Sequence, residues 1–130
     1  MIDFHLETRS GVPTYLQLVQ QVRQAIRLGI LKPGDQLPTV KEVVGALAIN
    51  PNTVLKAYRE LERDGLVGGR PGQGTFVLQS LAGPALASHA ALQESLRRWL
   101  RSAQEAGLDH ESVVALVTET LREAYEEDVA

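Results

Sequence analysis

Polar residues between positions 50 and 59 carry side chains that can bind a DNA groove. They are Asn50, Asn52, Thr53, Lys56 and Arg59. An Asn side chain can form two hydrogen bonds with adenine, a Thr side chain can contact a base edge or a thymine methyl, and cations can reach phosphates. The alternative interpretation is that Asn50 and Thr53 only cap a helix and that the cations form a solvated face, as on most lone helices.

These residues lie on a helix that we expect to run from Pro51 to Asp64. Asn50 is a favourable N-cap, and Pro51 costs nothing at the first helical position, where an N–H would lack a partner in any case. Gly65 supplies the left-handed residue that ends many helices. Apolar residues at i, i+3, i+4 and i+7 predict a buried stripe formed by Val54, Ala57, Tyr58 and Leu61.

A second, shorter helix is expected just before this one, from about Val40 to Ala48. Thr39 and Glu42 have the spacing of a capping box, in which each side chain accepts a hydrogen bond from a backbone N–H at the start of the helix. This helix should bury Val43, Val44 and Leu47. Two helices joined by the short turn 48–50 form a helix-turn-helix, whose second helix enters the DNA major groove. This pairing favours the DNA-binding interpretation.

A β-hairpin is expected after Gly65, with one strand beginning at Leu66–Val67, a loop over residues 68–74 and a return strand at Thr75–Leu78. Branched and aromatic residues around a Gly/Pro cluster are typical of hairpins. Gly72 and Gly74 would let the backbone approach a phosphate or enter a minor groove, and Arg70 and Gln73 could donate hydrogen bonds. The alternative is a plain Gly-rich loop. It is not a nucleotide-binding loop, because no Gly-Lys-Ser/Thr follows.

A further helix, from about Thr14 to Leu28, should act as a scaffold behind the helix-turn-helix and end at Gly29. Its expected buried residues are Leu18, Val22, Ala25 and Ile26. Its polar face, which we expect to be solvated, consists of Gln17, Gln20, Gln21, Arg23, Gln24 and Arg27.

Residues 80–84 are rich in helix breakers, and two amphipathic helices should follow, the first closed by Gly107 and the second capped by Asp109. Two such helices cannot enclose a core alone, so their apolar stripes need a partner. We expect a twofold partner, since readers of palindromic DNA act as dimers. The alternative is packing against the chain's own DNA-binding module. The expected dimerisation residues are Leu92, Leu96, Trp99, Leu100, Val113, Val117 and Leu121.

Composition excludes several classes of protein. The chain of 130 residues has no cysteine, so disulfides and thiolate metal sites are impossible. No apolar run approaches the ~20 residues of a membrane span, and no basic leader precedes an apolar segment. We therefore expect a cytoplasmic protein without a membrane partner. The three histidines lack metal-ligand spacing and no catalytic set is visible, so we expect no metal, no cofactor and no enzyme activity.

Charge is distributed unevenly along the chain. The formal net charge is −3 overall, divided into +2 for residues 1–80 and −5 for residues 81–130. This asymmetry indicates a mildly basic nucleic-acid face and an acidic remainder. Because +2 is modest, two modules of a dimer should share the phosphate contacts. About 45 residues after the joint are too few for a dedicated ligand cavity, so any small-molecule effector stays unidentified and would lodge at the dimer seam.

From Pro13 to Val77 the chain resembles the winged helix-turn-helix domain of GntR-type bacterial repressors. The matching segments are 13–15, 29–38, 52–54, 61–66 and 72–77. The segment 50–53 and the short tail are similar to the YtrA-type branch. The resemblance implies DNA contacts from Lys41, Asn52, Thr53 and the wing around Gly72 and Gln73. We add Thr39, at the start of the same helix as Lys41.

The sequence departs from many members of this family at the expected DNA-binding helices. Lys41 stands where many members have Arg, and Pro51 and Leu55 stand where another Arg occurs. Lys is a point charge, whereas the planar fork of Arg suits guanine. We therefore expect fewer contacts to guanine bases in the operator than in those family members, or weaker DNA contacts overall.

The sequence as a whole predicts a mainly α protein with a small β-hairpin. Residues 12–80 would form a winged helix-turn-helix DNA-binding domain, and residues 81–130 a helical dimerisation tail. The expected function is a homodimeric repressor on a palindromic operator. One alternative is a winged-helix protein-interaction module without DNA binding. Another is the front end of an aminotransferase-like regulator with pyridoxal phosphate, which the acidic terminus argues against.

Overall fold

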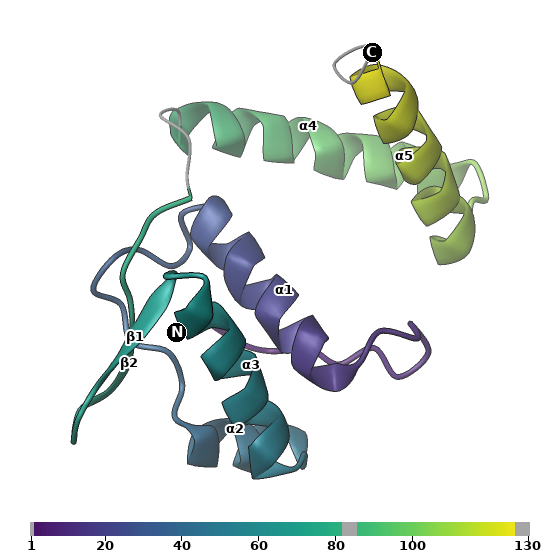
Figure 1. The fold of residues 1–130 in the computed structure, drawn as a ribbon. Helices are drawn as coiled ribbons and strands as arrows, with labels where there is room; N and C mark the ends of the chain where they lie inside the picture. The colour runs from purple at the N-terminus through teal and green to yellow at the C-terminus, as the bar shows by residue number, and fades with distance from the viewer. Residues whose placement is uncertain (1, 82–85, 127–130) are drawn as a thin grey trace. The chain divides into compact units, whose positions relative to one another are not determined.

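The computed structural model describes residues 2–81 and 86–126 of the chain. The chain divides into two compact units, Met1–Leu86 and Ala87–Ala130. The first contains α1, α2, α3 and the hairpin β1–β2, and the second contains most of α4 and all of α5 (Figure 1). Most of the expected joint at residues 80–84 lies outside the described residues.

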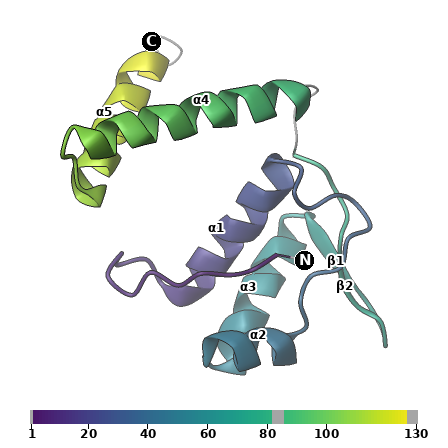
Figure 2. The same cartoon turned by 180° about the vertical axis from the view of Figure 1, so that it is seen from behind.

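Three helices make the core of the first unit: α1 (Thr14–Arg27), α2 (Val40–Leu47) and α3 (Pro51–Arg63). Helix α1 lies alongside α3, and α2 packs against the start of α3 (Figures 1 and 2). The stripes expected on α1 and α3 are confirmed as buried. On α2 only Val43 is fully buried, whereas Val44 and Leu47 are half-buried at the edge of the core.

The expected helix caps are confirmed at both α2 and α3. The Thr39 hydroxyl accepts a hydrogen bond from the Glu42 N–H at 3.1 Å, and the Glu42 carboxylate accepts one from the Thr39 N–H. Ala48 and Asp64 stand as C-caps, one residue beyond the last helical positions. Gly65 takes the left-handed conformation that was expected of it. Local side-chain hydrogen bonds therefore set the starts of both helices, and backbone conformation at residues 48 and 65 sets where they stop.

The hairpin differs in extent from the sequence prediction. Strand β1 spans Val67–Arg70 and pairs antiparallel with β2, Gly74–Val77. Gly68, Gly69 and Arg70 were expected in the loop, yet they pair with Phe76, Thr75 and Gly74, the last of which was also expected in the loop. Leu66 and Leu78, which were expected in the two strands, lie just outside them. The loop prediction was wrong there because pairing with an adjacent strand, rather than local propensity, extends the ladder.

The polar face predicted for α1 is also partly wrong, because Gln17 is buried with 8% of its surface exposed. The N-terminal segment folds back along α1, and the Gln17 amide bonds to it. The side-chain oxygen accepts from the Glu7 N–H at 2.8 Å, and the nitrogen donates to the carbonyls of Glu7 and Val12 at 3.0 and 2.9 Å. A buried amide with these partners is satisfied, which is why a polar residue can face the interior.

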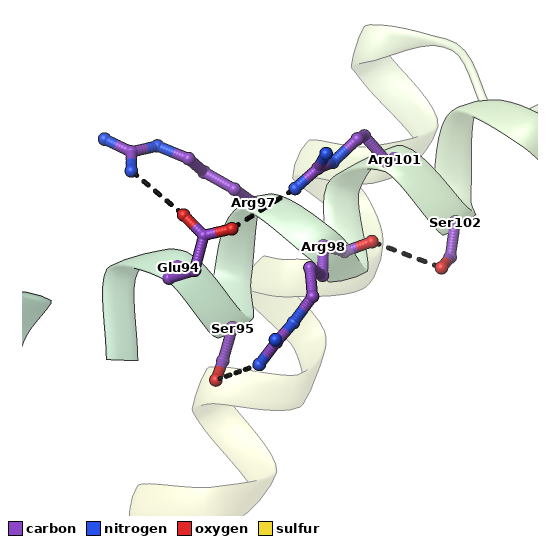
Figure 3. A network of polar contacts seen from close by, with 6 residues as sticks. All are labelled: Glu94, Ser95, Arg97, Arg98, Arg101 and Ser102. Atoms are coloured by element: carbon purple, nitrogen blue, oxygen red, sulfur yellow. Dashed lines mark hydrogen bonds and ion pairs between the residues drawn. The ribbon is translucent and has the colours of Figure 1, made fainter. Parts of the chain in front are cut away.

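The second unit consists of α4 (Leu86–Glu105) and α5 (His110–Tyr125). Asp109 caps α5 as expected, since its carboxylate accepts a hydrogen bond from the Ser112 N–H at 2.8 Å. Hydrogen bonding to the Ser112 side chain, and then to its N–H, lowers the pKa of Asp109. On the polar side of α4, Glu94 bonds to both Arg97 and Arg101 at 3.3 Å (Figure 3). No described residue of α5 is fully buried, so this unit leaves much apolar surface open.

Candidate nucleic-acid interface

The outer face of α3 presents the polar residues expected there. Asn52, Lys56 and Arg59 are exposed and Thr53 is half-buried. The opposite face is anchored by the fully buried stripe of α3. Because that stripe fixes the rotation of the helix, the polar residues must face away from the core. The arrangement leaves amide and ammonium groups free to meet an external ligand.

Asn50 and Thr39, both expected to bind DNA, also serve as helix caps. The Asn50 side-chain oxygen accepts a hydrogen bond from the Asn52 N–H at 2.8 Å. Thr39 holds the first turn of α2 in the same way. One acceptor position of each side chain is therefore committed to the fold, and a DNA contact would have to use its remaining hydrogen-bonding capacity.

The expected residues gather around two open hollows. One, of about 380 Å³, is lined by Thr14, Tyr15, Asn50, Asn52, Thr53 and Lys56. The other, of about 650 Å³, is lined by Thr39 and by residues 69–75 of the hairpin. The second hollow brings Thr39 together with Arg70, Gly72 and Gln73. Lys41 and Arg59 are exposed but line neither hollow.

The hairpin forms a wing beside the helix-turn-helix. Its tip lies on the same side of the first unit as the N-terminal ends of α2 and α3 (Figures 1 and 2). This is the lower side in both views. The Arg70 guanidinium lies 4.4 Å from the centre of the Phe76 ring, a distance typical of a cation–π contact. The Arg70 side chain therefore lies across the wing, against the Phe76 ring of the opposite strand.

The wing tip rests on Gln36, which the sequence interpretation did not assign to the site. The Gln36 side-chain nitrogen donates to the Gln73 carbonyl at 3.0 Å, and a backbone bridge joins Gln36 to Phe76. Tyr15 was missed as well, although its ring lies 4.0 Å from the Lys56 ammonium nitrogen. Neither contact leaves a local signal, because the partners are far apart in sequence. The segments that resemble the GntR-type domain include both residues, but the resemblance implied no role for either.

The loop before α2 is tied to α3 through Tyr58. Its hydroxyl donates to the Pro38 carbonyl at 2.6 Å inside the core. Burial, followed by the negative charge of Glu42, raises the pKa of Tyr58 well above its usual value near 10. The hydroxyl therefore stays protonated and keeps donating at physiological pH. This bond holds Thr39 at the entrance of α2, next to the wing.

The residues predicted to mediate dimerisation lie on the second unit and are mostly open to solvent. Leu92, Leu96 and Trp99 are exposed on α4, and Leu121 is exposed on α5, whereas Leu100, Val113 and Val117 are half-buried. A hollow of about 410 Å³ between α4 and α5 is lined mainly by apolar side chains, including Leu96, Trp99, Val117 and Leu121. Four of the seven predicted residues therefore share one apolar hollow.

Metal and membrane sites were not expected from the sequence. Among the described residues, no cluster of three or more His, Asp or Glu could hold a metal ion. No helix within residues 2–81 and 86–126 has both the length and the apolar character needed to cross a bilayer.

Three helices with a helix-turn-helix at α2–α3, followed by a β-hairpin wing, define the first unit as a winged helix-turn-helix. Comparison with known proteins identifies the family to which this chain belongs. The family model for bacterial regulatory proteins of the gntR family matches residues 14–77. The transcriptional repressor YtrA of Bacillus subtilis is 36% identical over 109 residues, which cover 83% of this chain and 84% of YtrA. The chain therefore belongs to the gntR family, and the resemblance to the YtrA-type branch is confirmed.

Solved structures agree with this assignment. The GntR-family transcription factor YtrA of Sulfolobus acidocaldarius superposes with a TM-score of 0.55 at 28% identity, covering 75% of this chain and 97% of that one. The DNA-binding domain of AraR in complex with operator ORX1 gives a TM-score of 0.51 at 25% identity, covering 58% of this chain and 95% of that one. The mainly α fold with a winged helix-turn-helix and C-terminal helices is thus confirmed.

Proposed function

We propose that this protein is a transcription repressor that binds a palindromic DNA operator as a homodimer. Helix α3 enters the major groove, and the wing contacts the backbone near the minor groove. The observation that carries this proposal is the outer face of α3, where Asn52, Lys56 and Arg59 stand exposed opposite a fully buried stripe. The family membership and the similarity to an operator-bound domain support it.

Each expected contact has a distinct chemical task. Asn52 suits a bidentate bond to adenine, and Thr53 suits a base edge or a thymine methyl. Lys41, Lys56, Arg59 and Arg70 supply positive charge for phosphates, and the Thr39 and Gln73 side chains can add hydrogen bonds to them. Gly72 has a positive φ of 74° and no side chain, and a Cβ at this position would meet no atom within 4 Å, so the wing tip is narrow and open enough to approach a backbone. The caps at Thr39 and Asn50 hold α2 and α3 in the orientation that these contacts require.

The proposed dimer forms through α4 and α5. Leu92 is 67% exposed and Trp99 is 38% exposed, so both leave apolar surface that a second copy can cover. Because twofold symmetry matches the protein to two half-sites, the tail sets the spacing between the two copies of α3. Two modules, each with a modest positive charge, then share the phosphate contacts.

The experiment that tests this function starts from DNA selected by the purified protein from a random pool. Affinity for the selected duplex is then measured by gel-shift titration at several salt concentrations. Asn52→Ala should cost about 1–3 kcal/mol and relax the preference at one base pair. Lys41→Ala and Lys56→Ala should weaken binding for all sequences and each reduce the salt slope by about 1.

Arg27→Ala is a charge-matched control, because Arg27 is exposed in the last turn of α1 and belongs to neither helix of the helix-turn-helix. It should leave affinity within about twofold of the parent, as a charge change at a site without contacts. Unchanged affinity in all three variants of α2 and α3 would refute the proposal. A winged helix that binds only proteins would show no salt-sensitive DNA affinity at all.

A further inference from the structure

We propose that Tyr15 is a positioning residue that holds the Lys56 ammonium in place for a DNA phosphate. This inference rests on the proposed function and adds a residue of α1 to it. Tyr15 lies outside the helix-turn-helix, 41 positions before Lys56 in the sequence. Their contact links the scaffold helix to the proposed recognition helix.

The geometry of the contact is that of a cation over an aromatic face. The Lys56 Nζ lies 4.0 Å from the centre of the Tyr15 ring, within the ~6 Å over which the ring quadrupole attracts a cation. Tyr15 is half-buried and packs against the core, so its ring has a fixed place. Lys56 is exposed, and both residues border the hollow that contains Asn52 and Thr53. The ammonium is therefore held beside the residues proposed to read bases.

The charge of Lys56 stays available because its partner is a ring. Arg23 forms an ion pair with Asp64, and Arg63 forms one with Glu60 at 3.7 Å. Among the described residues, no carboxylate lies within ion-pair distance of Lys56, and the first turn of α3 contains no acidic residue. A carboxylate would cancel the positive charge, whereas a ring restrains the ammonium without cancelling it.

Restraint of this kind favours binding through entropy. A free lysine side chain has many accessible rotamers, and much of this freedom is lost when the ammonium is fixed on a phosphate. A side chain that is already restrained in the free protein loses less of it. At exposed sites such contacts are weak, so removing the ring should weaken DNA binding only about two- to fivefold.

The test compares four variants of the full chain on the selected duplex: Tyr15→Phe, Tyr15→Leu, Lys56→Met and the double variant Tyr15→Leu/Lys56→Met. Tyr15→Phe keeps the ring and should bind within about twofold of the parent. Tyr15→Leu should lose about two- to fivefold in affinity. Lys56→Met should bind more weakly and lower the salt slope by about 1. In the Lys56→Met background, Tyr15→Leu should have no further effect.

Several outcomes would overturn the positioning role. If Tyr15→Phe loses as much as Tyr15→Leu, the hydroxyl rather than the ring is what matters. If the loss from Tyr15→Leu persists in the Lys56→Met background, Tyr15 acts independently of Lys56. If Lys56→Met lowers the salt slope while Tyr15→Leu leaves affinity unchanged, this inference fails and the proposed function stands. An absence of salt-dependent binding by the parent protein would refute both.

A second measurement needs no DNA. In the folded parent protein, the ring should shift the NMR signals of the Lys56 Hε protons upfield of those of Lys41, an exposed lysine on α2. The shift should persist in Tyr15→Phe. Equal Hε shifts for Lys56 and Lys41 in the parent protein would contradict the contact itself.

Discussion

The Gln36 side-chain nitrogen donates a hydrogen bond of 3.0 Å to the Gln73 carbonyl, and so joins the loop before α2 to the tip of the wing. Gly74, the next residue, makes this approach possible. A Cβ built on Gly74 would lie 2.5 Å from the same Gln36 nitrogen, and Gly74 has a φ of +126°. The Gln36 side chain and the absent side chain at Gly74 therefore add to the backbone hydrogen bonds that hold the wing against the loop before α2.

Gly74→Ala should move the Gln36 amide and strain the backbone. We expect a loss of about 1–3 kcal/mol in the free energy of unfolding, measured by urea titration, because a non-Gly residue rarely adopts this φ. Gly72→Ala is the control: Gly72 also has a positive φ, but its Cβ would meet no atom within 4 Å. Gly72→Ala should therefore lose less in the free energy of unfolding than Gly74→Ala, because only Gly74→Ala also displaces the Gln36 amide. Equal losses in the two variants would show that the close approach of Gln36 to position 74 does not matter for stability.

Gln17→Leu tests the buried amide that ties the N-terminal segment to α1. The variant keeps the approximate size but leaves the Glu7 N–H and the Val12 carbonyl without their partner. We expect a loss of about 1–3 kcal/mol in the free energy of unfolding. Gln20→Leu, at an exposed position of the same helix, should change it by no more than about 0.5 kcal/mol. Similar values for both variants would mean that the Gln17 bonds contribute nothing to stability.

Tyr58→Phe tests the buried hydroxyl bonded to the Pro38 carbonyl. Near neutral pH the variant should lose about 1 kcal/mol in the free energy of unfolding. Folding raises the pKa of Tyr58, so its contribution is fully present below the unfolded pKa near 10 and is lost as the pH rises beyond it. The parent protein should therefore lose stability above pH 10 more steeply than Tyr58→Phe does, as urea titrations at a series of pH values would show. Parallel curves in that range would contradict the raised pKa.

Leu96→Glu tests the proposed dimer. Leu96 is 51% exposed and lines the apolar hollow between α4 and α5, so a carboxylate there would be buried in the proposed interface. Sedimentation velocity should show a dimer for the parent chain and a monomer for Leu96→Glu at micromolar concentration. Gln93→Glu, which adds the same charge at an exposed polar position of α4, should stay dimeric. A monomeric parent chain, or a dimeric Leu96→Glu, would exclude this surface as the interface.

Much of the fold could be predicted because its signals are local. The Thr39–Glu42 capping box, the Asn50–Pro51 start of α3 and the Asp109 cap each involve residues at most three positions apart. The buried stripe of α3 follows from helical periodicity alone. The exposed polar face of α3 could be predicted as well, because burial of the apolar stripe fixes the rotation of the helix and turns the polar residues toward solvent.

The errors lie where distant segments meet. The strand through Gly68 and Gly69 has no local propensity for β structure and exists because Phe76 and Thr75 pair with it. Gln17 has the polarity of a surface residue and is buried because residues ten positions earlier fold back over it. Neither contact could be inferred from spacing, because both depend on where the rest of the chain lies.

The sequence by itself determined the helices, their caps, the helix-turn-helix and the family, since these depend on neighbouring residues and on motifs in a set order. Only the tertiary structure decided how the candidate site is supported. Tyr15 reaches Lys56 across the α1–α3 contact, and Gln36 reaches Gln73 across the wing. A side chain bonds with whatever the packed core brings within a few ångströms, and that packing depends on the whole unit rather than on any one segment.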